Sequence, residues 1–238
     1  MTPPIVLLAL GSWEQHGAHL PFDTDTVIIE SVVDAAIRSV DPENTQFSVV
    51  PTIGVTASDE HNGFAGTLSI GTNALSDAVV SIARSASWAR GICIVNGHGG
   101  NSALTAMMNR EIRLKYGLQT FLAHPHMPAD QGGSSAVSEL GMGVHGGMDE
   151  TSVMLHLRPE LVDMSLAVRR VPEKLAENEQ VRSGGRVAFG WLSNDFFPEG
   201  HIGDPTDATA ELGAQMVRSA TDSLGGALRE ISRFDFGR

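Results

Sequence analysis

Residues 5–25 read IVLLALGSWEQHGAHLPFDTD, in which an unbroken apolar run leads directly into a polar segment that contains glycine. A short continuous apolar run is typical of a β-strand buried on both faces, as in a parallel sheet covered by helices. The run ICIV at residues 92–95 has the same character, and the polar segment NGHGGN at residues 96–101 follows it. Together they predict a parallel sheet with polar loops at the carboxyl ends of its strands.

Strands and helices alternate along the first half of the chain. Apolar runs predict strands at residues 5–10, 47–50, 67–70, 92–95 and 118–123. Helical spacing predicts helices at residues 24–40, capped by Thr24 or Asp25, at residues 72–90, capped by Thr72, and at residues 101–116. This alternation is typical of βαβ units, and we expect one α/β domain over residues 1–238 with a mostly parallel sheet.

The second half of the chain is richer in glycine, serine and histidine. We expect loops near a site at residues 124–147, a short helix at residues 149–157, and an exposed or mobile segment at residues 171–186. Asp204 as N-cap and Pro205 at the first helical position then predict a last helix that runs to about residue 233.

Composition narrows the class of protein. The formal net charge of the 238 residues is −12, which disfavours nucleic acids and anionic membranes as partners. The single cysteine, Cys93, excludes an intramolecular disulfide and is interpreted as a small buried apolar residue. The N-terminal residues lack a basic signal region, and no apolar run approaches the ~20 residues that span a bilayer. We therefore expect a cytoplasmic protein.

Side chains that bind metals gather in the two polar segments. Glu14 and His16 are two residues apart, so in extended backbone they point to the same side. Asp25, at a helix N-terminus, has two oxygens with which to bridge two ions, and His98 follows the neighbouring strand. These are ligand types for Zn²⁺, Mn²⁺ or Fe²⁺. A lone histidine after a strand is usually a satisfied polar residue, and the shared sheet edge favours the metal site instead.

A third cluster, HGGMDETS, occupies residues 145–152. Its functional interpretation makes His145 a proton shuttle and Glu150 a metal ligand or general base; the alternative is helix capping alone. His61 either contacts substrate or supports its loop. His19 is expected to support the loop by hydrogen bonding.

In order along the chain, these clusters resemble the creatininase family of amidohydrolases. Its pattern is similar to GSxEQHGxHLP with a downstream TD, then NGHGGN, then HAGxxETS, and HNGFAGT at residues 61–67 resembles its HxxFPGT. The resemblance implies a three-layer α/β/α fold, two divalent metal ions per chain (Zn, Fe or Mn) and homo-oligomers, with a hexamer as one candidate.

Carried over by position, the resemblance implies that one metal is held by Glu14, Asp25 and His98 and the other by His16 with the bridging Asp25. In creatininase a glutamate completes the second set, and Gly100 stands at that position here. This departure disfavours creatinine as substrate, and Glu150 is the candidate replacement ligand. The residues expected to bind substrate are His61, Gly99, Gly100 and Trp191.

Trp13 and residues 190–206 resemble one branch of the family, the peptidases of mycofactocin biosynthesis. That resemblance implies metal-assisted hydrolysis of a modified precursor peptide near its C-terminus, which releases a small cyclised dipeptide-derived product. Trp191 with Phe196 and Phe197 would line the pocket for an aromatic product, unless they are ordinary core. The alternatives are hydrolysis of a small cyclic amide or formamide, and a non-catalytic protein with a structural metal.

Overall fold

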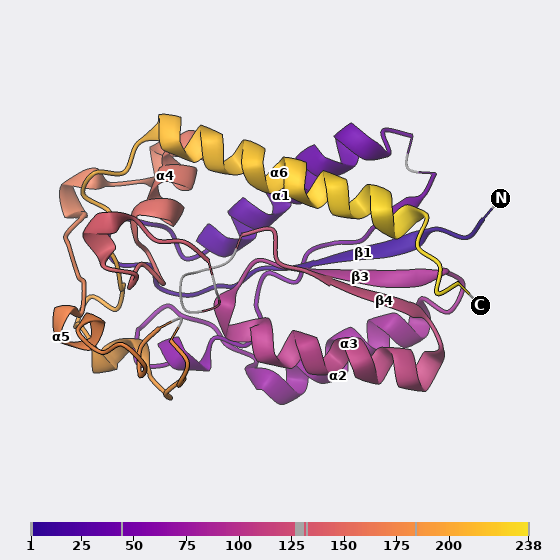
Figure 1. Ribbon diagram of the computed structural model, residues 1–238, viewed down its shortest axis with the longest axis horizontal. Coiled ribbons are helices and arrows are strands. Elements are labelled where there is room, and N and C mark those ends of the chain that lie inside the picture. The colour runs from indigo at the N-terminus through magenta and orange to yellow at the C-terminus, as the bar shows by residue number, and fades with distance from the viewer. Residues whose placement is uncertain (1, 44, 127–130, 132, 184, 238) are drawn as a thin grey trace.

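The computed structural model describes residues 2–43, 45–126, 131, 133–183 and 185–237, and its centre is a parallel β-sheet (Figure 1). The sheet has four strands in the order β2-β1-β3-β4. Their bounds are β1 Ile5–Leu10, β2 Phe47–Val49, β3 Gly91–Asn96 and β4 Gln119–Ala123. Leu10 and Asn96 are register partners, so β1 and β3 end at the same level and their following loops begin side by side.

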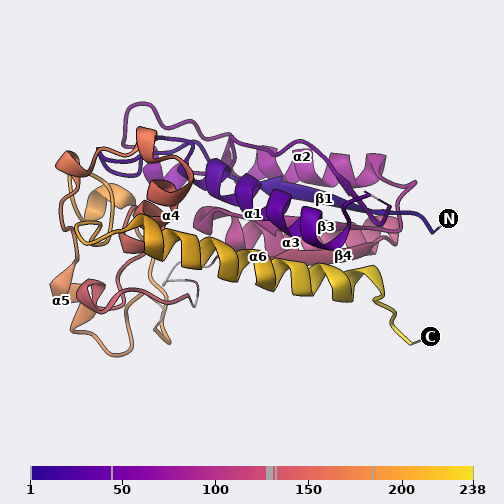
Figure 2. The same cartoon turned by 90° about the horizontal axis from the view of Figure 1, so that it is seen from above.

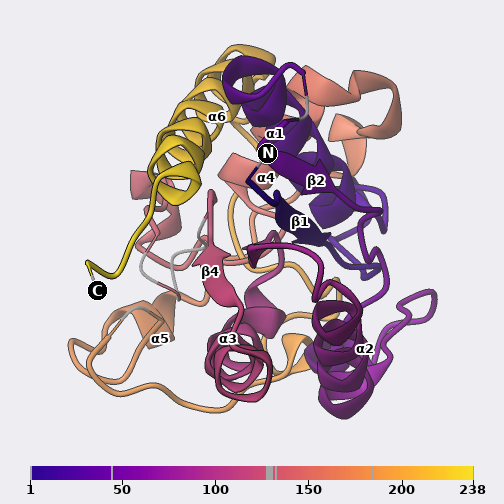
Figure 3. The ribbon, with the colours of Figure 1, turned by 90° about the vertical axis from the view of Figure 1, so that its right-hand side faces the viewer.

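Helices cover both faces of the sheet, and the three-layer α/β/α arrangement is confirmed (Figure 3). Strand residues alternate between two apolar clusters. On one face Leu7 and Val95 pack with residues of α1 (Thr24–Val40) and α6 (Ala210–Ser232). On the other face Leu8 and Ile94 pack with residues of α2 (Gly71–Ser85) and α3 (Ser102–Tyr116). Both faces are therefore buried, as the unbroken apolar runs indicate.

The remaining elements gather beyond the carboxyl ends of the strands, away from both termini (Figure 2). They include α4 (Met148–Leu157), which packs on α1 and α6, and α5 (Glu173–Ala176). Residues 124–147 are largely irregular as expected, although 127–130 and 132 lie outside the described residues, as does 184 in the segment 171–186. Among the described residues, no helix is both long and apolar enough to cross a bilayer.

Two expected elements differ in the structure. Residues 67–70 form no strand, because their backbone N–H groups bond to separate loops: Leu68 donates to Trp13 and Ile70 donates to Thr56. Helix α2 ends at Ser85 rather than near residue 90, and turns fill the interval before β3. The spacing of apolar residues does not by itself show whether a segment pairs with a neighbouring strand, nor at which residue a helix ends.

The expected helix caps were also wrong. Helix α6 begins at Ala210, where the Thr209 hydroxyl accepts a hydrogen bond from Leu212 N–H at 3.2 Å. Asp204 instead accepts from the backbone and hydroxyl of Thr206 in a local turn. Helix α1 follows Asp23 without a side-chain cap, and α2 follows Ile70, so the predicted caps Thr24 and Thr72 lie inside their helices and Asp25 lies in the first turn of α1. The helix expected at residues 101–116 ends as predicted, at Gly117, which adopts the left-handed conformation at φ 69°.

Candidate metal centre

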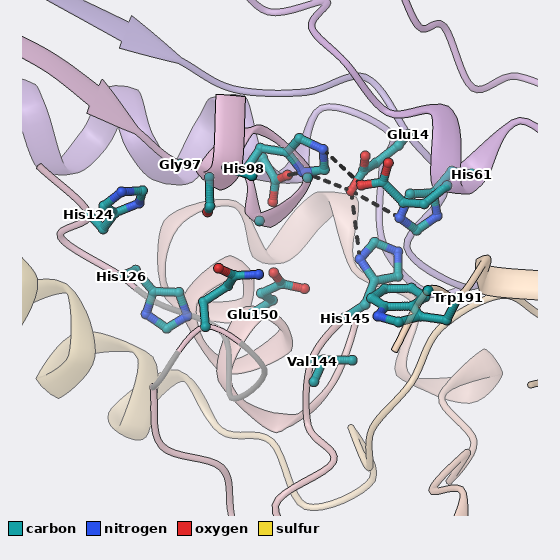
Figure 4. Close-up of a pocket in the computed structure, with 18 of the residues that line it drawn as sticks. Glu14, His61, Gly97, His98, His124, His126, Val144, His145, Glu150 and Trp191 are labelled. Atoms are coloured by element: carbon teal, nitrogen blue, oxygen red, sulfur yellow. Dashed lines mark hydrogen bonds and ion pairs between the residues drawn. The ribbon is translucent and has the colours of Figure 1, made fainter. Parts of the chain in front are cut away.

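The predicted ligands meet at the edge of the sheet where β1 and β3 end. Glu14 and His16 lie in the loop after β1, His98 lies directly after β3, and Asp25 is in the first turn of α1. All four are buried. Figure 4 shows the contacts of Glu14 with the rings of His61, His98 and His145. The parallel register of the strands brings these distant segments together.

Asp25 lies between two imidazoles. Its Oδ1 is 3.3 Å from Nε2 of His16, and its Oδ2 is 3.0 Å from Nδ1 of His98. The Ser12 hydroxyl donates a hydrogen bond to Oδ2 at 2.8 Å, which fixes the carboxylate orientation. Each oxygen thus faces a different histidine, which is the arrangement that a carboxylate bridging two ions requires.

Glu14 has one carboxylate oxygen facing histidines and one without a partner. Oε1 is 3.3 Å from Nδ1 of His98 and 3.5 Å from Nε2 of His61, whereas the buried Oε2 has no hydrogen-bond partner among the described residues. Burial raises the pKa of Glu14 to about 8; the His98 charge opposes this and the Asp25 charge adds to it. A buried carboxylate oxygen without a donor is unfavourable unless a cation satisfies it.

Glu150 approaches the same cluster from the start of α4. Its Oε2 is 3.8 Å from Nε2 of His16 and accepts a hydrogen bond from Gly146 N–H at 2.6 Å. Burial raises the pKa of this carboxyl group above its ordinary value.

Among the described residues, four groups of three side chains could hold a metal ion, and two of these groups share Asp25. In each of the sets Glu14–Asp25–His98 and His16–Asp25–Glu150, one ligand atom per residue lies within 4.8 Å of the others. No lysine or arginine is among the described residues that line the surrounding cavity. Because three carboxylates and two imidazoles face one another and no lysine or arginine offsets them, these residues fit divalent metal ions, with Asp25 in both ligand sets.

His145 lies beside the first set of ligands. Its Nε2–H donates to the carbonyl of Gln15 at 2.5 Å, which leaves Nδ1 unprotonated and 3.7 Å from Oε1 of Glu14. Burial, and then the charge of His16, holds the pKa of this ring well below its ordinary value. The imidazole is therefore neutral, with a proton-accepting nitrogen on the side of the ligand cluster.

His61 is held as a neutral ring. Its Nδ1 accepts a hydrogen bond from the Gln15 amide at 2.9 Å and lies 2.9 Å from the Ser193 hydroxyl. Burial lowers its pKa to about 3. The other nitrogen, Nε2, faces Glu14 across 3.5 Å. His19 supports the neighbouring loop, with Nε2 3.0 Å from the hydroxyl of Thr151.

The ligands lie in the wall of a cavity of about 710 Å³ (Figure 4). The residues predicted to bind substrate that line this cavity are His61, Gly99, Gly100 and Trp191. His124 and His126 also line it, and the lining residues that the sequence did not single out include Glu60, Gln131 and Phe189. The only available signal for Glu60 was its position beside His61 in the polar segment 57–66.

The predicted aromatic lining is only partly correct. Trp191 reaches the cavity, and the ring of Phe196 packs against it edge-on at 5.7 Å without lining the cavity itself. Phe197 is also absent from the lining and lies under the guanidinium of Arg170 at 5.9 Å. Phe189, two residues before Trp191, supplies the second aromatic ring of the wall.

Known proteins are similar to this chain in sequence and in fold. A family profile described as "Creatininase: Creatinine amidohydrolase" matches residues 2–228. The "Mycofactocin precursor peptide peptidase" of Mycolicibacterium smegmatis is 38% identical over 234 residues, covering 93% of this chain and 84% of that protein. Its namesake in Mycobacterium tuberculosis is 34% identical over 241 residues, covering 98% and 86%. A solved structure named "Creatininase Mn" has a TM-score of 0.73 at 23% identity, covering 96% and 91%.

The profile spans nearly the whole chain, and the three motif clusters lie within its bounds. The two peptidase relatives also align with this chain over most of their own length. This chain therefore belongs to the creatininase family.

Proposed function

We propose that this protein is a metal-dependent hydrolase that cleaves a modified mycofactocin precursor peptide near its C-terminus and releases a small cyclised dipeptide-derived product. The observation that carries the chemistry is the pair of ligand sets sharing Asp25 in the wall of one cavity. The peptidase relatives, at 34–38% identity over most of the chain, support the choice of substrate.

Two divalent ions would be held by Glu14, Asp25 and His98 and by His16, Asp25 and Glu150. When bound, they would lower the pKa of a water molecule and polarise the carbonyl of the scissile amide. Gly146 N–H orients the Glu150 carboxylate, and this contact favours a ligand role for Glu150 over that of a general base.

His145 is the proposed proton carrier. Its Nε2–H is engaged by Gln15, so the free lone pair is at Nδ1, on the side of the ligand cluster. A neutral ring with a lowered pKa accepts a proton from the attacking water and releases it readily to the leaving amine.

The rest of the cavity suits an extended chain with an apolar end. Gly99 and Gly100 line the cavity next to His98; Gly99 carries no side chain that would keep peptide backbone away, and Gly100 leaves room for the Glu60 carboxylate. Trp191 and Phe189 offer an apolar wall for the released product, and His61 lies next to the ligands. We also propose that residues 1–238 form one domain and that the chain assembles into homo-oligomers, which light scattering would measure.

The test combines metal content with peptide cleavage. The chain is stripped with a chelator, reloaded with Zn²⁺, Fe²⁺ or Mn²⁺, and incubated with the modified precursor peptide, with products followed by mass spectrometry. We expect two ions per chain and metal-dependent loss of a C-terminal fragment. Asp25→Ala should remove both ions and abolish cleavage. Asp34→Ala, at an exposed position of the same helix, is the matched control and should retain both.

Two outcomes would contradict the proposal. Metal content that Asp25→Ala leaves unchanged would refute the shared site. Two bound ions without peptide cleavage, together with hydrolysis of a small cyclic amide or formamide, would support the alternative substrate class. Metal binding without either activity would support a structural metal.

A further inference from the structure

The carboxylate of Glu60 lies against the outer nitrogen of His98. Glu60 belongs to the 3₁₀ turn Asp59–His61, and its side chain is only 21% exposed. Its Oε1 is 3.3 Å from Nε2 of His98. None of the ion pairs among the described residues joins Glu60 to a lysine or arginine. A largely buried carboxylate in this position requires hydrogen-bond donors, and the His98 imidazole is the side-chain donor that it faces, besides its own backbone N–H.

Two acceptors determine which nitrogen of His98 carries the proton. Nε2 is 3.1 Å from the carbonyl of Ala57 and 3.3 Å from Glu60, and both oxygens accept hydrogen bonds. When Nδ1 binds an ion, the one proton that the ring keeps therefore resides on Nε2. Nδ1 is then unprotonated, 3.0 Å from Asp25 Oδ2 and 3.3 Å from Glu14 Oε1. Three electron-pair donors converge without a proton between them, which is the arrangement that a cation completes.

Gly100 has no side chain, and the contact between Glu60 and His98 occupies the space where a Cβ at position 100 would lie. A Cβ at position 100 would lie 2.1 Å from Oε1 of Glu60 and 2.5 Å from Nε2 of His98, both too short for any real contact. The carboxylate beside the centre thus comes from Glu60, from a different loop, and its presence requires glycine at position 100.

We propose that Glu60 is a positioning residue for the ion held by Glu14, Asp25 and His98. Its carboxylate accepts the Nε2 proton of His98 and so keeps the ring oriented with Nδ1 unprotonated and aimed at the ion. This inference rests on the metal centre of the proposed function. Carboxylates that hold a ligating histidine in this way typically change metal affinity about 10–100-fold when they are removed.

The test measures affinity rather than turnover. Zn²⁺ is titrated into the metal-free full chain against a chromogenic chelator, which yields a dissociation constant for each ion. Glu60→Ala should weaken one ion about 10–100-fold and leave the other unchanged. Glu60→Gln keeps a neutral acceptor oxygen and should weaken the same ion by less. His98→Ala identifies that ion, because His98 belongs to one ligand set only.

Glu30→Gln, at an exposed position of α1, is the control and should leave both constants unchanged. Far-UV circular dichroism of each metal-free variant verifies that it is folded. Wild-type constants retained in folded Glu60→Ala would overturn the inference while leaving the metal centre intact. Equal weakening in Glu60→Ala and Glu60→Gln would also overturn it, because the acceptor oxygen would then not matter. A wild-type chain that binds no Zn²⁺ would instead refute the proposed function.

Discussion

Replacing Glu139 by glutamine should destabilise the part of the fold that carries His145 and Glu150. Glu139 is almost completely buried, and its carboxylate accepts four hydrogen bonds from three segments. Oε1 accepts from the backbone N–H groups of Met148 at 2.9 Å and Asp204 at 2.8 Å. Oε2 accepts from the backbone of Ala136 at 3.1 Å and the hydroxyl of Ser135 at 3.0 Å.

The expected loss follows from this geometry. The amide of glutamine has one oxygen, so its NH₂ group faces either the two backbone N–H groups of Met148 and Asp204, or the Ala136 N–H together with the Ser135 hydroxyl, which can turn to accept. At least one hydrogen bond to a charged acceptor is lost, which costs about 1.5–3 kcal/mol, and the bonds that remain no longer end on a charge. Glycines enclose the carboxylate, since a Cβ at Gly143 or Gly147 would lie 1.9 Å or 2.3 Å from its oxygens, so little space remains for rearrangement.

Urea unfolding of the chelated protein, followed by circular dichroism, measures this loss. A loss of this size is a substantial part of the free energy of unfolding of a typical domain, which is about 5–15 kcal/mol. Helix α4 begins at Met148, so the variant should also bind the ion of the Glu150 set more weakly. The exposed control Glu30→Gln should stay within about 0.5 kcal/mol of the wild type. A loss below about 1 kcal/mol for Glu139→Gln would refute the reasoning.

Two further predictions concern the metal centre. Burial alone would lower the pKa of His16, but the Asp25 charge and hydrogen bond raise it to about 10 in the metal-free chain. The stability that this imidazolium contributes is complete below pH 6.5 and is lost as the pH rises through 10, so the urea midpoint of metal-free protein should fall over that window and that of Zn²⁺-loaded protein should not. Gly100→Ala should displace Glu60 and weaken Zn²⁺ binding in chelator competition, because its Cβ would lie 2.1 Å from that carboxylate. Gly226→Ala, at a helical glycine with open space around it, is the matched control and should stabilise the chain by about 0.5–1 kcal/mol. A midpoint that is flat with pH, or equal Zn²⁺ affinity in both glycine variants, would contradict these expectations.

Patterns within one segment predicted much of the fold. Strands β1 and β3 follow from their unbroken apolar runs, and α3 ends at Gly117 because glycine adopts the left-handed conformation readily. Errors occurred where a contact with another segment decided the outcome. Residues 67–70 have the composition of a strand, yet their N–H groups bond to two loops. Asp204 has the character of a cap, yet its own N–H bonds to the buried Glu139.

The sequence by itself determined the sheet, its parallel direction and the segments that end at its carboxyl edge, because apolar periodicity and the motif spacing are local properties. The motifs also predicted that Glu14, His16, Asp25 and His98 meet there with Glu150 as a candidate ligand, and only the tertiary structure decided how these side chains face one another and which others join them. It placed Glu150 beside His16, supplied Glu60 where Gly100 has no side chain, and brought Phe189 to the cavity wall. Those positions depend on packing between loops that are far apart in the chain. The spacing of residues within one segment does not determine how far that segment lies from another.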